Sequence, residues 1–166
     1  MNIENCTQED FLQIRDDIVE FWGSDRTLHL HHPIFLREFG DTAYVIRKGT
    51  RVLAYLFGFI AQKHPVGYVH LVAVREPLKG QGLGKCLYEH FAQIAAVRGC
   101  NALKAITSPG NEVSIAFHKA LGFELEGLPN ADGVPVVRDY AGKGNDLVVF
   151  RKSISEIGDV PQNINP

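Results

Sequence analysis

The stretch VGYVHLVAVREPLKGQGLGK at residues 66–85 decides the fold class, because a strand, a loop and a glycine-rich turn follow one another there. Val66 to Val74 is rich in β-branched residues, which predicts a strand, and Arg75 to Gly80 predicts a loop. From Gln81 onward, apolar residues recur at helical spacing. A helix is therefore expected to start there and to end near Gly99.

The loop before this helix carries alternating glycines at Gly80, Gly82 and Gly84, between Lys79 and Lys85. Glycine lets the backbone adopt conformations that other residues avoid, and it lets a ligand approach the chain closely. The start of a helix offers unpaired amide groups and the positive end of the helix dipole, which favour an anion. These features predict a phosphate-binding loop; a simple turn needs fewer glycines.

Two common phosphate motifs do not fit this loop. The dinucleotide fingerprint G-x-G-x-x-G, counted from Gly80, requires a glycine where Lys85 stands. The P-loop motif G-x-x-x-x-G-K-[ST], aligned on Gly84 and Lys85, requires a glycine at Lys79 and a hydroxyl at Cys86.

The segment from Lys79 to Gly84 instead resembles the coenzyme A motif [QR]-x-x-G-x-[GA] of the GNAT N-acetyltransferases, with lysine in place of glutamine or arginine. The segment from Asn111 through Ala116 to Phe123 resembles the family's second motif, N-x-x-x-x-A-x-Y-x-x-x-G-F, with His118 in place of the tyrosine. Together these motifs cover about half of the chain, in the order and context of the family. The chain is therefore identified as a member of this superfamily.

The resemblance implies an α/β fold in which a mixed, mostly antiparallel sheet is flanked by helices. It implies that acetyl-CoA is the acetyl donor, without a metal, and that it lies where the strands ending at Val74 and beginning at Ala102 separate. The residues implied to bind the cofactor are Val72, Ala73 and Val74 through their main chain, then Lys79, Gly80, Gln81, Gly82, Leu83, Gly84 and Lys85, and finally Asn111.

Three side chains are candidates for catalysis. His118 occupies the position of the tyrosine that usually protonates the leaving thiolate in this family. An imidazole is mostly neutral at pH 7, so it needs a raised pKa to protonate a leaving thiolate; alternatively, it only packs near the sulfur. The glutamate that some members carry before the asparagine is absent, so a base must come from elsewhere. His70 and Glu76 flank the end of the strand and are the candidates, with a strand side chain and an ordinary loop charge as the alternatives.

The histidine-rich segment Leu28 to His32 invites a metal interpretation. No Cys, Asp or third histidine stands at ligand spacing to His29 and His31. We therefore expect a polar surface segment near the acceptor entrance.

The rest of the chain is expected to complete one domain over residues 1–157, with a frayed tail at 158–166. Thr7 is expected to cap a helix that runs to Trp22, and Pro33 to open a short helix. The remaining predicted strands are Ile3–Cys6, Thr42–Arg47, Val52–Ile60, Ala102–Thr107, Phe123–Glu126 and Leu147–Arg151, and a second major helix is predicted at Asn111–Leu121.

Composition excludes several classes of protein. Hydrophobic residues make up 45% and charged residues 22% of the 166 residues, as in ordinary globular domains. The formal net charge of −2 lacks the basic excess of a nucleic-acid binder. No apolar run approaches the length of a membrane span, the N-terminus does not resemble a signal peptide, and the three cysteines show no metal or disulfide pattern. The expected location is the cytoplasm.

The leading hypothesis is an N-acetyltransferase that acts on a primary amine of a small molecule or peptide by direct attack in a ternary complex. A non-catalytic acyl-CoA-binding sensor or partner module is the alternative, and a nucleotide-binding protein is the third. No nucleic-acid or membrane partner is expected, and the resemblance allows a homodimer.

Overall fold

The computed structural model describes residues 2–154, which form two compact units. The first unit comprises the described residues up to Phe59 together with Val69–Phe91, and the second comprises Ile60–Tyr68 and the described residues from Ala92 onward. The tail predicted at 158–166 lies outside the described residues.

Four strands follow one another in the sheet of the first unit, in the order β1 (Ile3–Asn5), β2 (Ala43–Lys48), β3 (Arg51–Ile60) and β4 (Val66–Val74). β1 pairs with β2 and β2 with β3, both antiparallel. A hairpin turn joins β2 and β3, and Gly49 adopts a φ of 61° there. These strands confirm the predicted β regions of this half of the chain.

Two helices stand where the sequence predicts a single one: α1 (Gln8–Asp16) and α2 (Ile18–Trp22). As expected, Thr7 caps α1, and Asp10 completes a reciprocal capping box. The helix is interrupted at Asp17, where ψ is 19°, and the carboxylate of that residue binds Arg75. α2 ends at Trp22, where the sequence predicts the helix to end, and Gly23 follows in the left-handed conformation.

Short helical segments connect the first unit's longer elements. These are η1 (Leu28–Leu30), α3 (Ile34–Arg37), η2 (Gly40–Thr42) and η3 (Glu76–Leu78). The last of these replaces part of the loop predicted after Val74. The long helix α4 (Leu83–Val97) follows the glycine-rich segment, and the chain leaves it through Gly99, whose φ is 78°.

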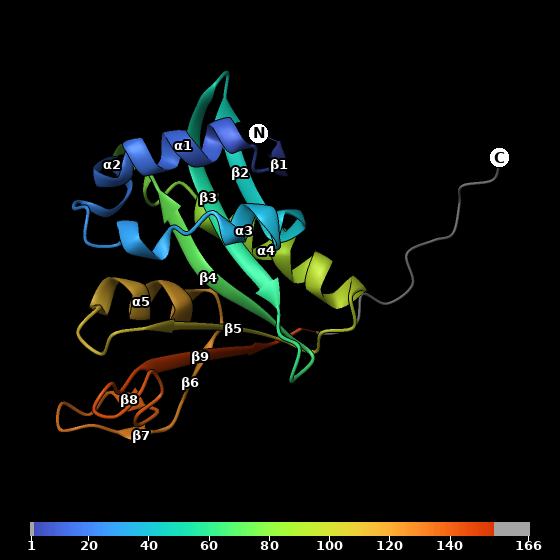
Figure 1. The fold of residues 1–166 in the computed structure, drawn as a ribbon. Coiled ribbons are helices and arrows are strands. Elements are labelled where there is room, and N and C mark those ends of the chain that lie inside the picture. Colours follow the sequence, from blue (N-terminus) through green and yellow to red (C-terminus); the bar gives the residue numbers. More distant parts are fainter. Residues whose placement is uncertain (1, 155–166) are drawn as a thin grey trace. The chain divides into compact units, whose positions relative to one another are not determined.

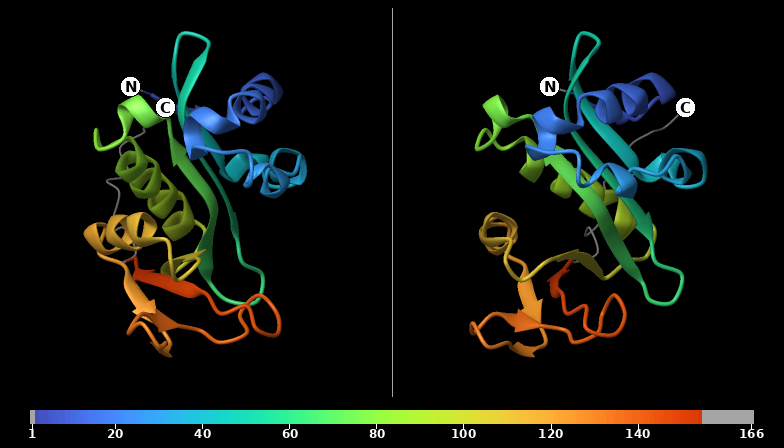
Figure 2. Two further views of the ribbon diagram at one scale, coloured as in Figure 1. Left: turned by 90° about the vertical axis from the view of Figure 1, so that its left-hand side faces the viewer. Right: turned by 60° about the vertical axis from the view of Figure 1, so that its left-hand side comes forward.

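The core of the first unit lies between α1–α2 and the strands. Phe11, Ile14 and Phe21 from the helices pack with Tyr55 and Phe57 from β3. Figure 1 shows α1 and α2 in blue across β2 and β3, and the turned views in Figure 2 show the start of α4 on the opposite side of these strands. A ring contact between Tyr44 on β2 and His90 on α4, with centroids 4.6 Å apart, belongs to that opposite side.

The second unit has the strand order β4, β5 (Ala102–Thr107), β9 (Val148–Ser153) and β6 (Glu124–Glu126), together with the helix α5 (Glu112–Ala120). β4 pairs with β5 in parallel, and β9 pairs antiparallel with both β5 and β6. The connection before β9 holds a two-stranded sheet of β7 (Leu128–Pro129) and β8 (Pro135–Val136), which the sequence does not predict.

The strand pairings confirm the predicted mixed, mostly antiparallel sheet with accompanying helices. Among residues 2–154, no helix has the length and apolar character needed to cross a membrane.

Candidate active site

The glycine-rich loop of the first unit has the geometry of a site that a ligand can approach. Gly80 and Gly82 have φ values of 78° and 83°, a region that favours glycine. Apart from the glycine and its two chain neighbours, no heavy atom lies within 4 Å of the position that a Cβ would take at either residue. The first intrahelical bond of α4 runs from the amide of Cys86 to the carbonyl of Gly82. The amides of Leu83, Gly84 and Lys85 in this first turn therefore lie beyond the reach of the helix's own carbonyls.

Charged side chains flank this loop on the surface. Lys79 is exposed and forms an ion pair with Glu76, while Lys85 lies 3.7 Å from the carboxylate of Glu89. Glu76, one of the predicted catalytic candidates, is thus an exposed carboxylate paired with a lysine of the loop. Cys86 is also exposed, whereas the other free cysteines, Cys6 and Cys100, are buried.

Arg75, directly after β4, carries a buried charge that the sequence analysis does not single out. Its side chain is only 2% exposed, and its guanidinium binds the carboxylates of Asp17 and Glu20 on the α1–α2 segment. The same guanidinium lies 4.6 Å from the centre of the Phe21 ring, and Nε donates to the carbonyl of Val52 at 2.5 Å. Arg75 therefore ties the end of β4 to α2.

His70 on β4 is held in one tautomer. Its Nε2 lies 3.2 Å from the carbonyl oxygen of Leu30, which can only accept, so Nε2 carries the proton. The ring stacks on Phe35 with centroids 4.3 Å apart. Burial lowers the pKa of His70, so the ring is neutral at pH 7. Within the described part of the chain, Nδ1 of His70 has no hydrogen-bond partner and keeps its lone pair.

His31 corrects the prediction of a polar surface segment. Leu28–Leu30 is a turn of 3₁₀ helix, and it leaves His29 exposed but buries His31 completely. His31 Nε2 is 2.6 Å from the hydroxyl of Tyr55, and Nδ1 is 2.9 Å from the carbonyl of Thr27. These hydrogen bonds satisfy the buried ring, which is why it is tolerated inside the unit. Burial lowers the pKa of His31 to about 4.

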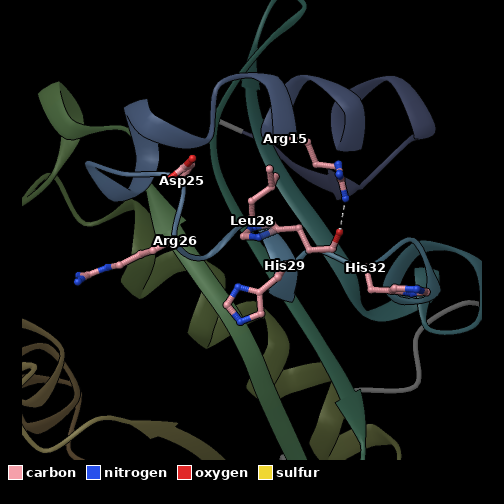
Figure 3. Close-up of a pocket in the computed structure, with 7 residues that line it drawn as sticks. Arg15, Asp25, Arg26, Leu28, His29 and His32 are labelled. Atoms are coloured by element: carbon pink, nitrogen blue, oxygen red, sulfur yellow. Dashed lines mark hydrogen bonds between the residues drawn. The ribbon is translucent and has the colours of Figure 1, made fainter.

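A pocket of about 510 Å³ opens beside this segment in the first unit. Arg15 lines this pocket and donates to the carbonyl of His31 at 2.7 Å. In Figure 3 the side chain of Arg26 points away from those of Arg15, Leu28 and His29. The lining residues are Arg15, Asp25, Arg26, Leu28, His29, His31 and His32. Among residues 2–154, no three His, Cys, Asp or Glu side chains are grouped to hold a metal ion.

In the second unit, Asn111 acts as the N-cap of α5. Its Oδ1 accepts from the amide of Ser114 at 3.1 Å, and its Nδ2 donates to the hydroxyl of Thr107 at 3.0 Å. These bonds show that Asn111 stabilises the start of α5. The contact with the cofactor arm that the resemblance implies stays a prediction.

His118 on α5 lies in an apolar environment. It is 4% exposed and stacks on Phe150 with centroids 4.0 Å apart, while Nδ1 donates to the carbonyl of Ser114 at 2.8 Å. Burial lowers the pKa of His118 to about 4. The raised pKa that a role as leaving-group acid requires is therefore not present, and these surroundings favour packing.

The sequence model described as the acetyltransferase (GNAT) family matches residues 8–123, which is more than half of the chain. The chain belongs to this family. The match covers the glycine-rich loop, His70, Asn111 and His118, so all the motifs from which the GNAT resemblance was inferred fall inside it.

Individual relatives agree with membership of the GNAT family. An L-methionine sulfoximine/L-methionine sulfone acetyltransferase from Pseudomonas paraeruginosa is 30% identical over 92 residues, which are 55% of this chain and 51% of that protein. The chain therefore spans about half the length of the curated relatives it matches.

Solved structures show the same fold at low identity. A ribosomal-protein-alanine N-acetyltransferase from Brucella melitensis has a TM-score of 0.64 and 20% identity, covering 92% of this chain and 99% of that one. An aminoglycoside 6'-N-acetyltransferase complexed with coenzyme A has a TM-score of 0.67 and 12% identity, covering 96% and 100%.

Sequence reasoning missed the buried cluster around Arg75 and the contacts of His31. Arg75 lies 58 residues from Asp17 and 55 from Glu20, and His31 lies 24 residues from Tyr55. No local spacing connects such partners, so no pattern within one element could have revealed them.

Proposed function

We propose that this protein transfers the acetyl group of acetyl-CoA to a primary amine of a small molecule or peptide, by direct attack in a ternary complex. The observation that carries this proposal is the open glycine loop at the start of α4, where Gly80 and Gly82 leave the backbone uncovered. Exposed Lys79 and Lys85 add positive charge beside the unpaired first-turn amides. This arrangement fits a pyrophosphate group.

Bound acetyl-CoA would supply a thioester, which an amine converts to an amide as the carbon–sulfur bond breaks. The loop from Lys79 to Lys85 would hold its pyrophosphate, and the main chain of Val72 to Val74 its pantetheine arm. The amine must lose a proton when its nitrogen bonds to carbon, and the departing sulfur must gain one.

We assign the proton acceptor to His70. Its Nε2–H donates to the carbonyl of Leu30, so Nδ1 presents a lone pair. Burial lowers the pKa of His70 from its ordinary value, so the ring is neutral at pH 7 and able to accept a proton. Glu76 is less suited because its carboxylate already pairs with Lys79. We assign His118 a packing role on α5, in line with its lowered pKa and its stacking on Phe150.

Membership of the family supports an amine as the acceptor, without naming one compound. The Pseudomonas relative is named for amino-acid analogues, and the two structural neighbours for a ribosomal protein and an aminoglycoside. Each of the molecules in these names carries an amino group, and we propose an amine acceptor of this kind without choosing among them.

Calorimetric titration tests the donor site. We expect acetyl-CoA to bind with micromolar affinity, and NAD and ATP not to bind. Gly82→Asp should abolish binding, because it places a side chain and a negative charge where the pyrophosphate approaches. Gly49→Asp is the matched control, since Gly49 also has positive φ but lies in the β2–β3 turn. Retained affinity in Gly82→Asp would overturn the site, and preferential binding of ATP or NAD would favour the nucleotide-binding alternative.

Release of free coenzyme A with a panel of amines tests turnover. We expect amine-dependent release, and a fall in kcat of about 100-fold in His70→Gln, as removal of a general base typically gives. His64→Gln, at an exposed histidine of the β3–β4 connection, should match the wild type. Binding of acetyl-CoA without amine-dependent release would instead identify a non-catalytic acyl-CoA-binding module.

A further inference from the structure

A directional chain of hydrogen bonds crosses the core of the first unit. The indole Nε1 of Trp22 donates to the hydroxyl of Tyr55 at 2.6 Å, and that hydroxyl lies 2.6 Å from His31 Nε2. His31 Nδ1 faces the carbonyl of Thr27 at 2.9 Å, and a carbonyl can only accept. The proton of His31 therefore sits on Nδ1, Nε2 accepts, and Tyr55 must be the donor to it.

This chain fixes a short segment of backbone. The side chain of His31 is bonded to Thr27, the residue where the segment starts, and the carbonyl of His31 accepts from Arg15 at 2.7 Å. The amides of Leu30 and His31 donate to the carbonyls of Thr27 and Leu28, both at 3.0 Å. Residues 27–31 are thus held through main-chain and side-chain bonds at both ends.

The carbonyl between these anchors is the one that orients His70. Leu30 contributes its oxygen to Nε2 of His70 at 3.2 Å, and Phe35, four residues after His31, stacks on the same ring. A shift of the segment would move the acceptor that holds the proton of His70 on Nε2. It would also remove the reason for Nδ1 to keep its lone pair.

We propose that Tyr55 and His31 are positioning residues for His70: the Trp22–Tyr55–His31 chain places the Leu30 carbonyl so that His70 presents Nδ1 to the acceptor amine. The catalytic part of this inference rests on the proposed role of His70 as proton acceptor. The structural part, the control of the His70 tautomer, does not depend on catalysis.

The test is Tyr55→Phe, which removes one hydroxyl and leaves His31 Nε2 without its donor. In the wild-type protein with ¹⁵N-labelled histidine, long-range NMR correlations should show His70 protonated on Nε2. In Tyr55→Phe the two tautomers should both be populated. The kcat for the amine should fall about tenfold, as expected for a displaced catalytic group, while the KM for acetyl-CoA stays within about twofold.

Tyr44→Phe is the matched control. It also removes the hydroxyl of a buried tyrosine, which donates to the carbonyl of Asp41 at 2.8 Å. Tyr44 lies on β2, and its ring contacts His90 of α4. The variant should leave the His70 tautomer as in the wild type. An unchanged tautomer and an unchanged kcat in folded Tyr55→Phe would overturn the inference, as would equal effects of both variants.

A second variant covers the case in which Tyr55→Phe does not fold. Trp22→Phe removes only the outermost donor of the hydrogen-bond chain and should shift the His70 tautomer in the same direction by a smaller amount; no shift would overturn the inference.

Failure of the proposed function is recognised separately. Full activity in His70→Gln would refute the proton acceptor while leaving the tautomer measurement to decide the positioning role.

Discussion

Arg75 illustrates how much one residue can contribute when its charge is buried. Its guanidinium is almost inaccessible, whereas the side chains of its partners Asp17 and Glu20 are 33% and 50% exposed. Removing the cation would leave these carboxylates without their main partner, and it would remove the packing on Phe21. The partial exposure of the acids lets water compensate in part.

Arg75→Met should lower the free energy of unfolding by about 2 kcal/mol, below the range for fully buried pairs because both partners reach solvent. Arg51→Met is the internal control, because Arg51 binds the same Glu20 at 3.0 Å but is 63% exposed. It should change stability by no more than about 0.5 kcal/mol. Urea unfolding followed by circular dichroism measures both, and similar losses in the two variants would contradict this account of Arg75.

At this scale the sequence predicted the backbone features that depend on neighbouring residues in the chain. The positive φ of Gly80 and Gly82 and the open backbone around them follow from glycines placed before a helix. The burial of His31 did not follow, because the hydroxyl that satisfies it comes from Tyr55 on another element. A histidine in a histidine-rich loop segment looks exposed until its distant partner is known.

At the scale of elements, one side chain at the start of α5, that of Asn111, has two roles to be separated: capping the helix and binding the cofactor. Asn111 caps the helix through Oδ1, and the family resemblance also gives it a contact with the cofactor. Serine can provide the capping oxygen but is too short to replace the amide.

Asn111→Ala should therefore cost about 1 kcal/mol of stability through the lost cap, and Asn111→Ser close to nothing. If the amide also binds the cofactor, both variants should weaken acetyl-CoA binding to a similar extent. Thermal unfolding and calorimetric titration of the two variants separate the roles. Unchanged affinity in the stable Asn111→Ser variant would restrict Asn111 to capping.

Elements bounded by strong local signals were predicted closely. β4 occupies Val66–Val74, as predicted, and α5 lies between Asn111 and Gly122. The interruption at Asp17 could not be predicted, because apolar spacing continues through it and its partner Arg75 is remote in sequence. The two-residue strands β7 and β8 are too short to show an alternating pattern.

At the scale of the whole molecule, each compact unit contains one buried histidine whose pKa lies at about 4, His31 in the first unit and His118 in the second. In the unfolded chain the pKa of a histidine is near 6.5. Between these values the unfolded state binds protons that the folded state does not, so acid favours unfolding.

Stability should fall as the pH drops from about 6.5 to about 4, by up to roughly 3 kcal/mol for each histidine, and should depend little on them above that range. Urea unfolding at several pH values measures this slope. His118→Phe, which retains an aromatic ring on Phe150, should reduce the slope, and the lowered pKa values of His31, His70 and His90 should keep part of it. The same slope in wild type and variant would show that His118 is not the source.

The exposure of Cys86 gives the protein a practical property. It stands in the first turn of α4, next to the glycine loop, while Cys6 and Cys100 are buried. A maleimide dye added to the folded protein should therefore attach at one place. Because that place adjoins the loop proposed to bind acetyl-CoA, the rate of labelling, or the emission of the attached dye, would give an optical signal of ligand binding without any engineered cysteine.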